Sequence, residues 1–215
     1  MTTDIFSFWE QINPKDYVHP ADSCVLNRVN HDFCLDCLPG PYMGPLRKAK
    51  VVLLYLSPGW NQSDAVDALT VKGQNYYAEQ RKGCAELPSP HEHPEASKWL
   101  QSRTKIFSEW KNLRDKIAVL NIGAYHSQNF NDHPLLTALP SCRESVSWAQ
   151  STLFPQALQG DRVVVCMRAA RYWGLSTGEK YGEALYAPRV TPGGHMCHGE
   201  LREEIIQKVK DHLNR

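Results

Sequence analysis

An uninterrupted apolar run, Val51 to Leu56, constrains the fold of this chain more than any other stretch. Apolar and polar side chains do not alternate in it, which is typical of a strand buried on both faces, as in a parallel sheet. The run ends at Ser57-Pro58-Gly59. Proline cannot continue a central strand, and glycine lets the backbone turn or approach a ligand closely. Because α/β sheets bind ligands at the carboxyl ends of their strands, this loop is a candidate site. An ordinary turn after a core strand explains the same residues.

Further strands and helices alternate along the chain. Apolar runs predict strands at 117–122, 163–167 and 184–190. Helical spacing predicts helices at 4–11, 97–116, 144–158, 169–175 and 200–213. Pro155 is expected to kink or end the helix that contains it. The alternation predicts an α/β fold, namely a three-layer α/β/α sandwich with a four-stranded parallel sheet.

The length of 215 residues predicts a single domain. Within this domain, residues 1–45 are expected to form an N-terminal helix and an irregular lead-in, and residues 46–215 the core of strands and helices. The net charge of +1 argues against a protein held to nucleic acid by bulk charge, but it leaves room for a local basic groove. The start MTTDIFSFWEQ lacks the pattern of a signal peptide, and no apolar stretch approaches the roughly 20 residues that span a bilayer. The lack of these two patterns, together with an odd number of cysteines (seven), predicts a reduced cytoplasmic protein with no membrane partner.

Two of the cysteines, Cys34 and Cys37, form a CxxC motif. A metal site would need two more ligands, which Cys84, His91 or His93 could supply. A lone CxxC is weak support for a metal, so we predict buried free thiols and no metal site.

Polar residues follow the predicted strands at their carboxyl ends. Asn121 stands near the end of one strand and precedes the polar loop Tyr125-His126-Ser127, and Arg168 follows another strand. A buried amide must find partners or meet a ligand, so Asn121 either binds a ligand or caps the following loop.

Two stretches have no regular period. Segment 61–94 is either a functional loop or hides a short helix. Its adjacent tyrosines, Tyr76 and Tyr77, either stack on a planar ligand or cover the core. Segment 191–198, TPGGHMCH, is a glycine-rich loop. The chain has no GxGxxG, GxxxxGK[ST] or GxSxG motif, so these patterns support neither dinucleotide binding, nor a P-loop, nor an esterase-type nucleophile.

Three of these motifs together resemble the uracil-DNA glycosylase superfamily. LLYLSPGW is similar to the first active-site motif of its mismatch-specific and related bacterial branches. AVLNIGAYHS resembles the strand whose terminal asparagine reads the base, and TPGGH resembles the second motif, a loop that enters the minor groove. The family also has a four-stranded parallel sheet between helices. PGPYMG before the first apolar run is similar to an uncharacterised bacterial branch, and the resemblance spans about residues 38–213.

The resemblance implies a role for each matching residue. Asn121 would read the base edge, and His195 would stabilise negative charge on the leaving base. Ser57 stands where the family usually carries Asp, Asn or Glu, so Ser57, Asn61 and Asp64 remain alternatives for positioning the water. The other residues of the base pocket would be Gly59, Trp60, Tyr76 and Tyr77. The residues that would contact DNA are Tyr125, His126, Ser127, Arg168, Gly193 and Gly194.

The implied activity is that of a DNA glycosylase, which hydrolyses the N-glycosidic bond of a base flipped out of DNA. The base would be uracil or another altered pyrimidine, including a hypermodified base of phage DNA. We expect a monomer whose partner is DNA. We also expect no cofactor, because Cys34 and Cys37 begin an iron–sulfur pattern that no later cysteines complete at the expected spacing. Two alternatives stay open: a non-catalytic nucleic-acid or nucleotide-binding protein that retains the fold, and a phosphate-handling small-ligand α/β enzyme.

Overall fold

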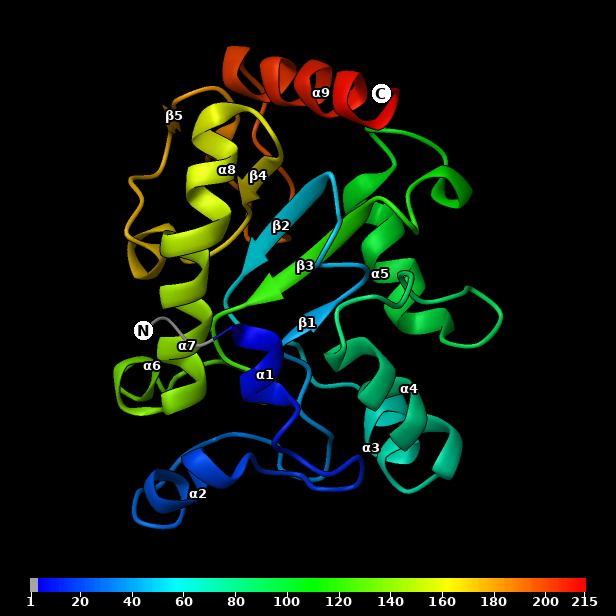
Figure 1. The fold of residues 1–215 in the computed structure, drawn as a ribbon, viewed down its shortest axis with the longest axis vertical. Helices are drawn as coiled ribbons and strands as arrows, with labels where there is room; N and C mark the ends of the chain where they lie inside the picture. The colour runs from blue at the N-terminus through cyan, green and yellow to red at the C-terminus, as the bar shows by residue number, and fades with distance from the viewer. Residues whose placement is uncertain (1–3) are drawn as a thin grey trace.

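The computed structural model describes residues 4–215, so residues 1–3 of the predicted lead-in lie outside the described residues. A mixed, mostly parallel sheet lies at the centre, with its strands in the order β1-β3-β2-β4-β6-β5 (Figure 1). The strands are β1 (Tyr42–Met43), β2 (Val51–Tyr55), β3 (Ile117–Asn121), β4 (Val163–Cys166), β5 (Glu179–Tyr181) and β6 (Leu185–Ala187).

The four predicted strands form the parallel centre of this sheet. In the register, Tyr55 of β2 lies opposite Asn121 of β3, and Leu54 lies opposite Cys166 of β4. The predicted number of strands was wrong, because the sheet has six. β1 and β5 add one antiparallel pair at each edge of the four parallel strands. β1 has two residues and β5 has three, two of them exposed, so neither produces a sequence pattern that predicts a strand.

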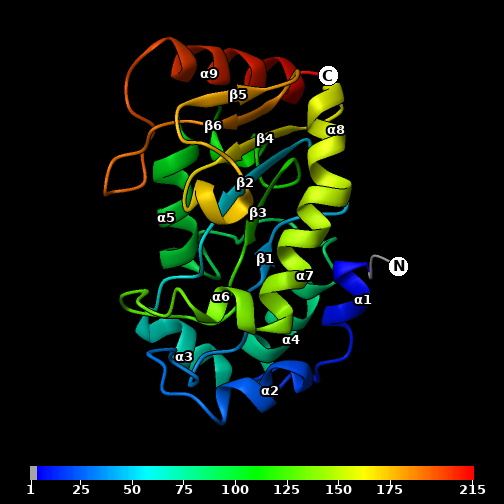
Figure 2. The same cartoon turned by 90° about the vertical axis from the view of Figure 1, so that its left-hand side faces the viewer.

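Side chains of the central strands alternate between two hydrophobic clusters. Val52 and Leu54 join a cluster with α1 (Ile5–Trp9), α7 (Pro140–Trp148) and α8 (Phe154–Gln159). Val51 and Leu53 join the other cluster, with Leu100 of α5 (Pro94–Thr104) and Ile205 of α9 (Glu200–Leu213). Figure 2 shows α5 on one side of the sheet and α7 and α8 on the other. Parallel strands need this cover because both of their faces are apolar.

The helix around Pro155 does not end early. The helical path runs through α7, a π-helical turn at Ala149–Leu153 and then α8, which contains Pro155 near its start. Proline has no N–H to donate to the preceding turn, and the widened π turn lies directly beside that missing hydrogen bond.

Several short helices lie where no periodic pattern predicted them. Segment 61–94 holds α3 (Gln62–Ala68) and α4 (Val71–Arg81), and the lead-in holds α2 (Pro20–Leu26). The predicted helix at 97–116 begins earlier and ends at Thr104, and only a 3-10 turn, Trp110–Asn112, follows it. α6 (Leu135–Ala138) was also not predicted, whereas the helix predicted at 169–175 is present as a 3-10 helix at Ala170–Trp173. Among residues 4–215, no helix is long and apolar enough to cross a bilayer.

Candidate active site

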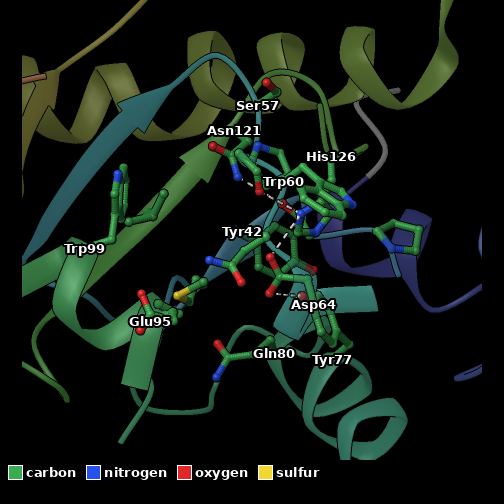
Figure 3. A pocket seen from close by; sticks show the side chains of 18 of the residues that line it. Tyr42, Ser57, Trp60, Asp64, Tyr77, Gln80, Glu95, Trp99, Asn121 and His126 are labelled. Carbon is green, nitrogen blue, oxygen red and sulfur yellow. Dashed lines mark hydrogen bonds and ion pairs between the residues drawn. The ribbon is translucent and has the colours of Figure 1, made fainter. Parts of the chain in front are cut away.

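A pocket of about 290 Å³ opens at the carboxyl ends of β2 and β3 (Figure 3). Its walls come from the loops after these strands, from α3, α4 and α5, and from the segment 39–43. The predicted site residues that line it are Ser57, Gly59, Trp60, Asn61, Asp64, Tyr76, Tyr77, Asn121 and His126.

The pocket forms here because the loops after β2 and β3 remain paired beyond the sheet. The Trp60 N–H donates to Ser127 O at 3.0 Å, and the Ser127 N–H donates to Pro58 O at 3.3 Å. Gly59 and Ser127 thereby form an isolated parallel bridge. Residues that are about 70 positions apart in sequence therefore lie in one wall, as expected for neighbouring parallel strands.

Asn121 is held by the segment that precedes the sheet. Its side-chain Nδ2 donates to Gly40 O at 2.9 Å, and its backbone N–H donates to Pro41 O at 2.8 Å. The side chain is therefore oriented by Gly40 and does not cap the following loop. Its Oδ1 accepts no hydrogen bond from the described residues, so a ligand N–H can use it.

Asp64 lies at the centre of the polar contacts in the pocket. Its Oδ1 accepts from the Tyr77 hydroxyl at 3.1 Å, and its Oδ2 lies 3.6 Å from His126 Nδ1. Burial raises the pKa of Asp64, against the opposing effects of His126 and the Tyr77 hydrogen bond. A carboxylate with a raised pKa is suited to accept a proton from water.

His126 points inward and supports Asp64. Its Nδ1 lies 2.9 Å from Gly59 O, which can only accept, so Nδ1 carries the proton. The ring therefore directs an N–H at both Gly59 O and the Asp64 carboxylate. Its Nε2 is buried without a partner among the described residues.

The predicted phosphate contact does not fit the loop Tyr125-His126-Ser127, because all three residues are buried. The Tyr125 hydroxyl donates to Asp22 Oδ2 at 2.5 Å, deep in the first hydrophobic cluster. The loop holds the wall of the pocket together and leaves no side chain for a DNA strand outside it.

The other two water-positioning candidates differ from Asp64. Asn61 is exposed, and its Oδ1 accepts from the Ser63 N–H at 2.9 Å, which caps α3. Ser57 lies at the edge of the pocket, beyond Asn121 as seen from Asp64 (Figure 3). The Asn61 Oδ1 also accepts from the Ser63 hydroxyl at 2.9 Å, so its contacts stay within the start of α3, whereas Asp64 joins Tyr77 of α4 to His126.

Aromatic rings form much of the remaining wall. Tyr77 is buried and donates to Asp64, whereas Tyr76 stacks on His93 with ring centroids 3.7 Å apart. Other large side chains that line the pocket were not predicted as site residues, among them Tyr42, Gln80, Arg81, Glu95 and Trp99. Tyr42 stands in the PGPYMG segment, but the others lie on helices that reach the pocket only through tertiary packing.

The glycine-rich loop lies outside the pocket. His195 is exposed and does not line the pocket, so the structure does not bring it to Asn121. Arg168 donates to Pro192 O, and Arg103 Nη2 donates to Gly193 O at 2.9 Å. Gly194 is buried between these two arginines at a φ of +79°. The loop therefore forms a separate surface with two cationic side chains.

The cysteine motif stands apart from any cluster of ligands. Cys34 is half-buried and Cys37 is buried, and both are free thiols. In the part of the chain that the structure describes, no three side chains of His, Cys, Asp or Glu gather as a metal site.

No family model, curated protein or solved structure matches this chain.

Proposed function

We propose that this protein is a DNA glycosylase of the uracil-DNA glycosylase type, with the three-layer architecture of that superfamily. Its substrate would be uracil or another altered pyrimidine flipped out of DNA. One observation carries the proposal: Asn121 and Asp64 meet in an aromatic-lined pocket at the carboxyl ends of two neighbouring parallel strands. An extruded base needs stacking surfaces and hydrogen bonds to its edge, and this pocket supplies both.

The proposed reaction needs a positioned water and a recognised base. As the base–sugar bond breaks, the sugar gains oxocarbenium character and the base leaves as an anion. Asp64 would accept the proton of the attacking water, because its carboxylate is partly buried and oriented by Tyr77 and His126. Asn121 would select the base edge through its free Oδ1. Tyr77 and Trp60 would flank the ring.

The size of the pocket supports an altered base. Its volume of about 290 Å³ lies at the lower end of the roughly 300–1,000 Å³ that is common for small-ligand sites. That volume leaves room for a ring that carries an added group. A pocket of this size, enclosed mainly by apolar and aromatic side chains, is usual for small ligands.

The DNA strand would cross the surface formed by Arg103, Arg168 and the exposed Gly193. Neither arginine has a carboxylate within 4.0 Å among the described residues, so both charges are available to phosphates. Such contacts position a duplex without reading its sequence.

The test is base release from a panel of oligonucleotides that carry uracil, hypoxanthine, xanthine, thymine mismatches and hydroxymethylated or glucosylated cytosine. Alkaline cleavage at the resulting abasic site reports release. We expect release of one pyrimidine and a loss of about 100-fold or more in Asp64→Asn. The matched control is Asp67→Asn, since Asp67 lies one turn along α3, pairs with His93 at 3.2 Å and is outside the pocket lining. An unimpaired Asp64→Asn, or no release of any base, would contradict the proposal.

A further inference from the structure

Arg81 is a buried cation in the wall of the pocket. It is the last residue of α4, it is only 4% exposed, and it lines the same pocket as Asn121 and Asp64. The Tyr42 hydroxyl donates to its backbone carbonyl, which fixes the end of the helix. Among the described residues that line the pocket, no other lysine or arginine is present.

The guanidinium of Arg81 forms no close ion pair with any described residue. Its Nη1 donates to Pro39 O at 3.4 Å and its Nη2 to Pro14 O at 3.5 Å, both at the long limit of hydrogen bonding. No carboxylate lies within 4.0 Å of it in residues 4–215, and the carboxylate that acts on its pKa, Asp16, lies farther away. Burial lowers the pKa of Arg81 to about 10, so the group stays charged at neutral pH. An unpaired buried charge is costly, and an anionic ligand would offset that cost.

Arg81 and Asn121 are bound by neighbouring carbonyls of the same wall. Pro39 O accepts from Arg81, and Gly40 O accepts from Asn121 Nδ2 at 2.9 Å. Both side chains are therefore attached to the Pro39–Gly40 segment, which lines the pocket together with them. His195, the residue to which the resemblance assigned the leaving base, lies outside this pocket.

We propose that Arg81 contacts the extruded base and stabilises the negative charge that develops on it as the glycosidic bond breaks. This role rests on the proposed glycosylase function. In the step, the bond between the sugar C1′ and the ring nitrogen breaks, and its electron pair remains on the base. Water adds its oxygen to C1′ and gives a proton to Asp64, and the base anion later takes a proton from solvent. A fixed donor at a developing charge lowers the barrier because no reorganisation is needed during reaction.

A binding experiment tests the charge preference without requiring catalysis. Barbiturate is a pyrimidine ring that is anionic at neutral pH, whereas uracil is neutral. Titration calorimetry should show that the wild type binds barbiturate about tenfold more tightly than uracil, as expected for a charge-assisted hydrogen bond. Arg81→Gln should lose this preference and Arg81→Lys should retain most of it. Equal affinity for the two rings, or binding of neither, would overturn the role of Arg81.

A leaving-group experiment tests the catalytic step. The same oligonucleotide carries either uracil or 5-fluorouracil, whose anion is more stable and needs less assistance. Arg81→Gln should reduce uracil release by about 100-fold and 5-fluorouracil release by about tenfold or less. A purely structural role would reduce both equally, and that result would overturn the proposal. If the wild type releases neither base, the glycosylase function fails, and the binding experiment still decides whether the pocket prefers an anion.

Arg162→Gln is the matched control for both experiments. Arg162 is also a largely buried arginine whose Nη1 donates to a backbone carbonyl, Leu46 O, at 3.0 Å. It lies beside the start of β4, outside the pocket. We expect it to leave the barbiturate preference and the ratio of the two release rates unchanged, and thermal melts of all three variants establish that they are folded.

Discussion

At the residue scale, the central feature is a carboxylate that the fold keeps partly buried. Only 21% of the Asp64 side chain is exposed, and its two partners come from α4 and from the loop after β3. Three separate segments thus meet at one charged group. Such an arrangement places a proton acceptor where water is scarce, at a cost in folding stability.

That cost predicts a pH-dependent stability difference. The folded-state pKa of Asp64 is raised above the ordinary value of 3.8. The contribution of Asp64 to the free energy of unfolding is therefore fully present below pH 3.8 and is lost as the pH rises through the folded-state pKa. Asp64→Asn should therefore raise the Tm at neutral pH, because the amide oxygen still accepts from Tyr77 and carries no charge. The gain should disappear below pH 3.8, where the wild-type carboxyl is neutral in both states. Thermal melts of the wild type and the variant across pH measure this difference. A lower Tm for the variant than for the wild type at neutral pH would contradict the prediction.

At the element scale, the short helices α3 and α4 bring Asp64, Tyr77 and Arg81 to the pocket. The Thr70 side chain caps α4 by accepting from the Gly73 N–H at 3.0 Å. Gly73 then packs directly on the end of α3, where an added Cβ would lie 2.2 Å from Asp67 O. Backbone-to-backbone contact at this glycine sets the distance between the two helices.

Gly73→Ala should therefore destabilise the protein, although alanine is the better helix former by about 1 kcal/mol. The clash forces α3 and α4 apart and should lower the Tm by at least about 2–4 °C, which corresponds to roughly 1 kcal/mol in a chain of this size. Asn75→Ala is the control, because Asn75 is exposed on the same helix and should gain helix propensity without a clash. A Tm that rises in Gly73→Ala would show that the helices do not meet as closely as the structure indicates.

Helix prediction failed in this region for a physical reason. The buried positions of α4 are Gly73, Tyr77, Gln80 and Arg81, so a glycine and two polar side chains stand where an amphipathic helix normally has aliphatic residues. By contrast, α9 spans its predicted range, because Ile205, Val209 and Leu213 form a regular apolar stripe.

At the scale of the whole molecule, a nearly neutral chain holds two cationic side chains beside the same loop. Its net charge is +1, and Arg103 and Arg168 both donate to the loop at 191–195. This placement predicts DNA binding by a few phosphate contacts and not by bulk charge.

Replacement of both arginines by glutamine should weaken binding to an oligonucleotide with an uncleavable abasic analogue. It should also reduce the slope of log Kd against log salt by about two, because each phosphate contact contributes about one. Fluorescence anisotropy between about 50 and 200 mM salt measures this slope. Arg202→Gln is the control, since Arg202 lies on α9, pairs with Glu203 and makes no hydrogen bond or ion pair with residues 191–195. An unchanged slope in the double variant would place the DNA elsewhere.

The sequence by itself determined the parallel centre of the sheet, the strand that ends in Asn121 and the terminal helix. These features follow from apolar runs and periodic stripes, which are local properties of the chain. It also predicted a candidate ligand site after the first two central strands, where the pocket opens, because strand ends in such sheets meet at one edge.

Only the tertiary structure decided which polar groups share the pocket. It paired Asp64 with His126, which lies 62 positions away, brought Arg81 into the wall and left His195 outside. The physical reason is that burial and charge pairing depend on contacts between distant segments. In the sequence, Arg81 is an ordinary cation in a segment without a regular period. Only packing against the Pro39–Gly40 segment makes it a buried charge with no carboxylate within 4.0 Å among residues 4–215.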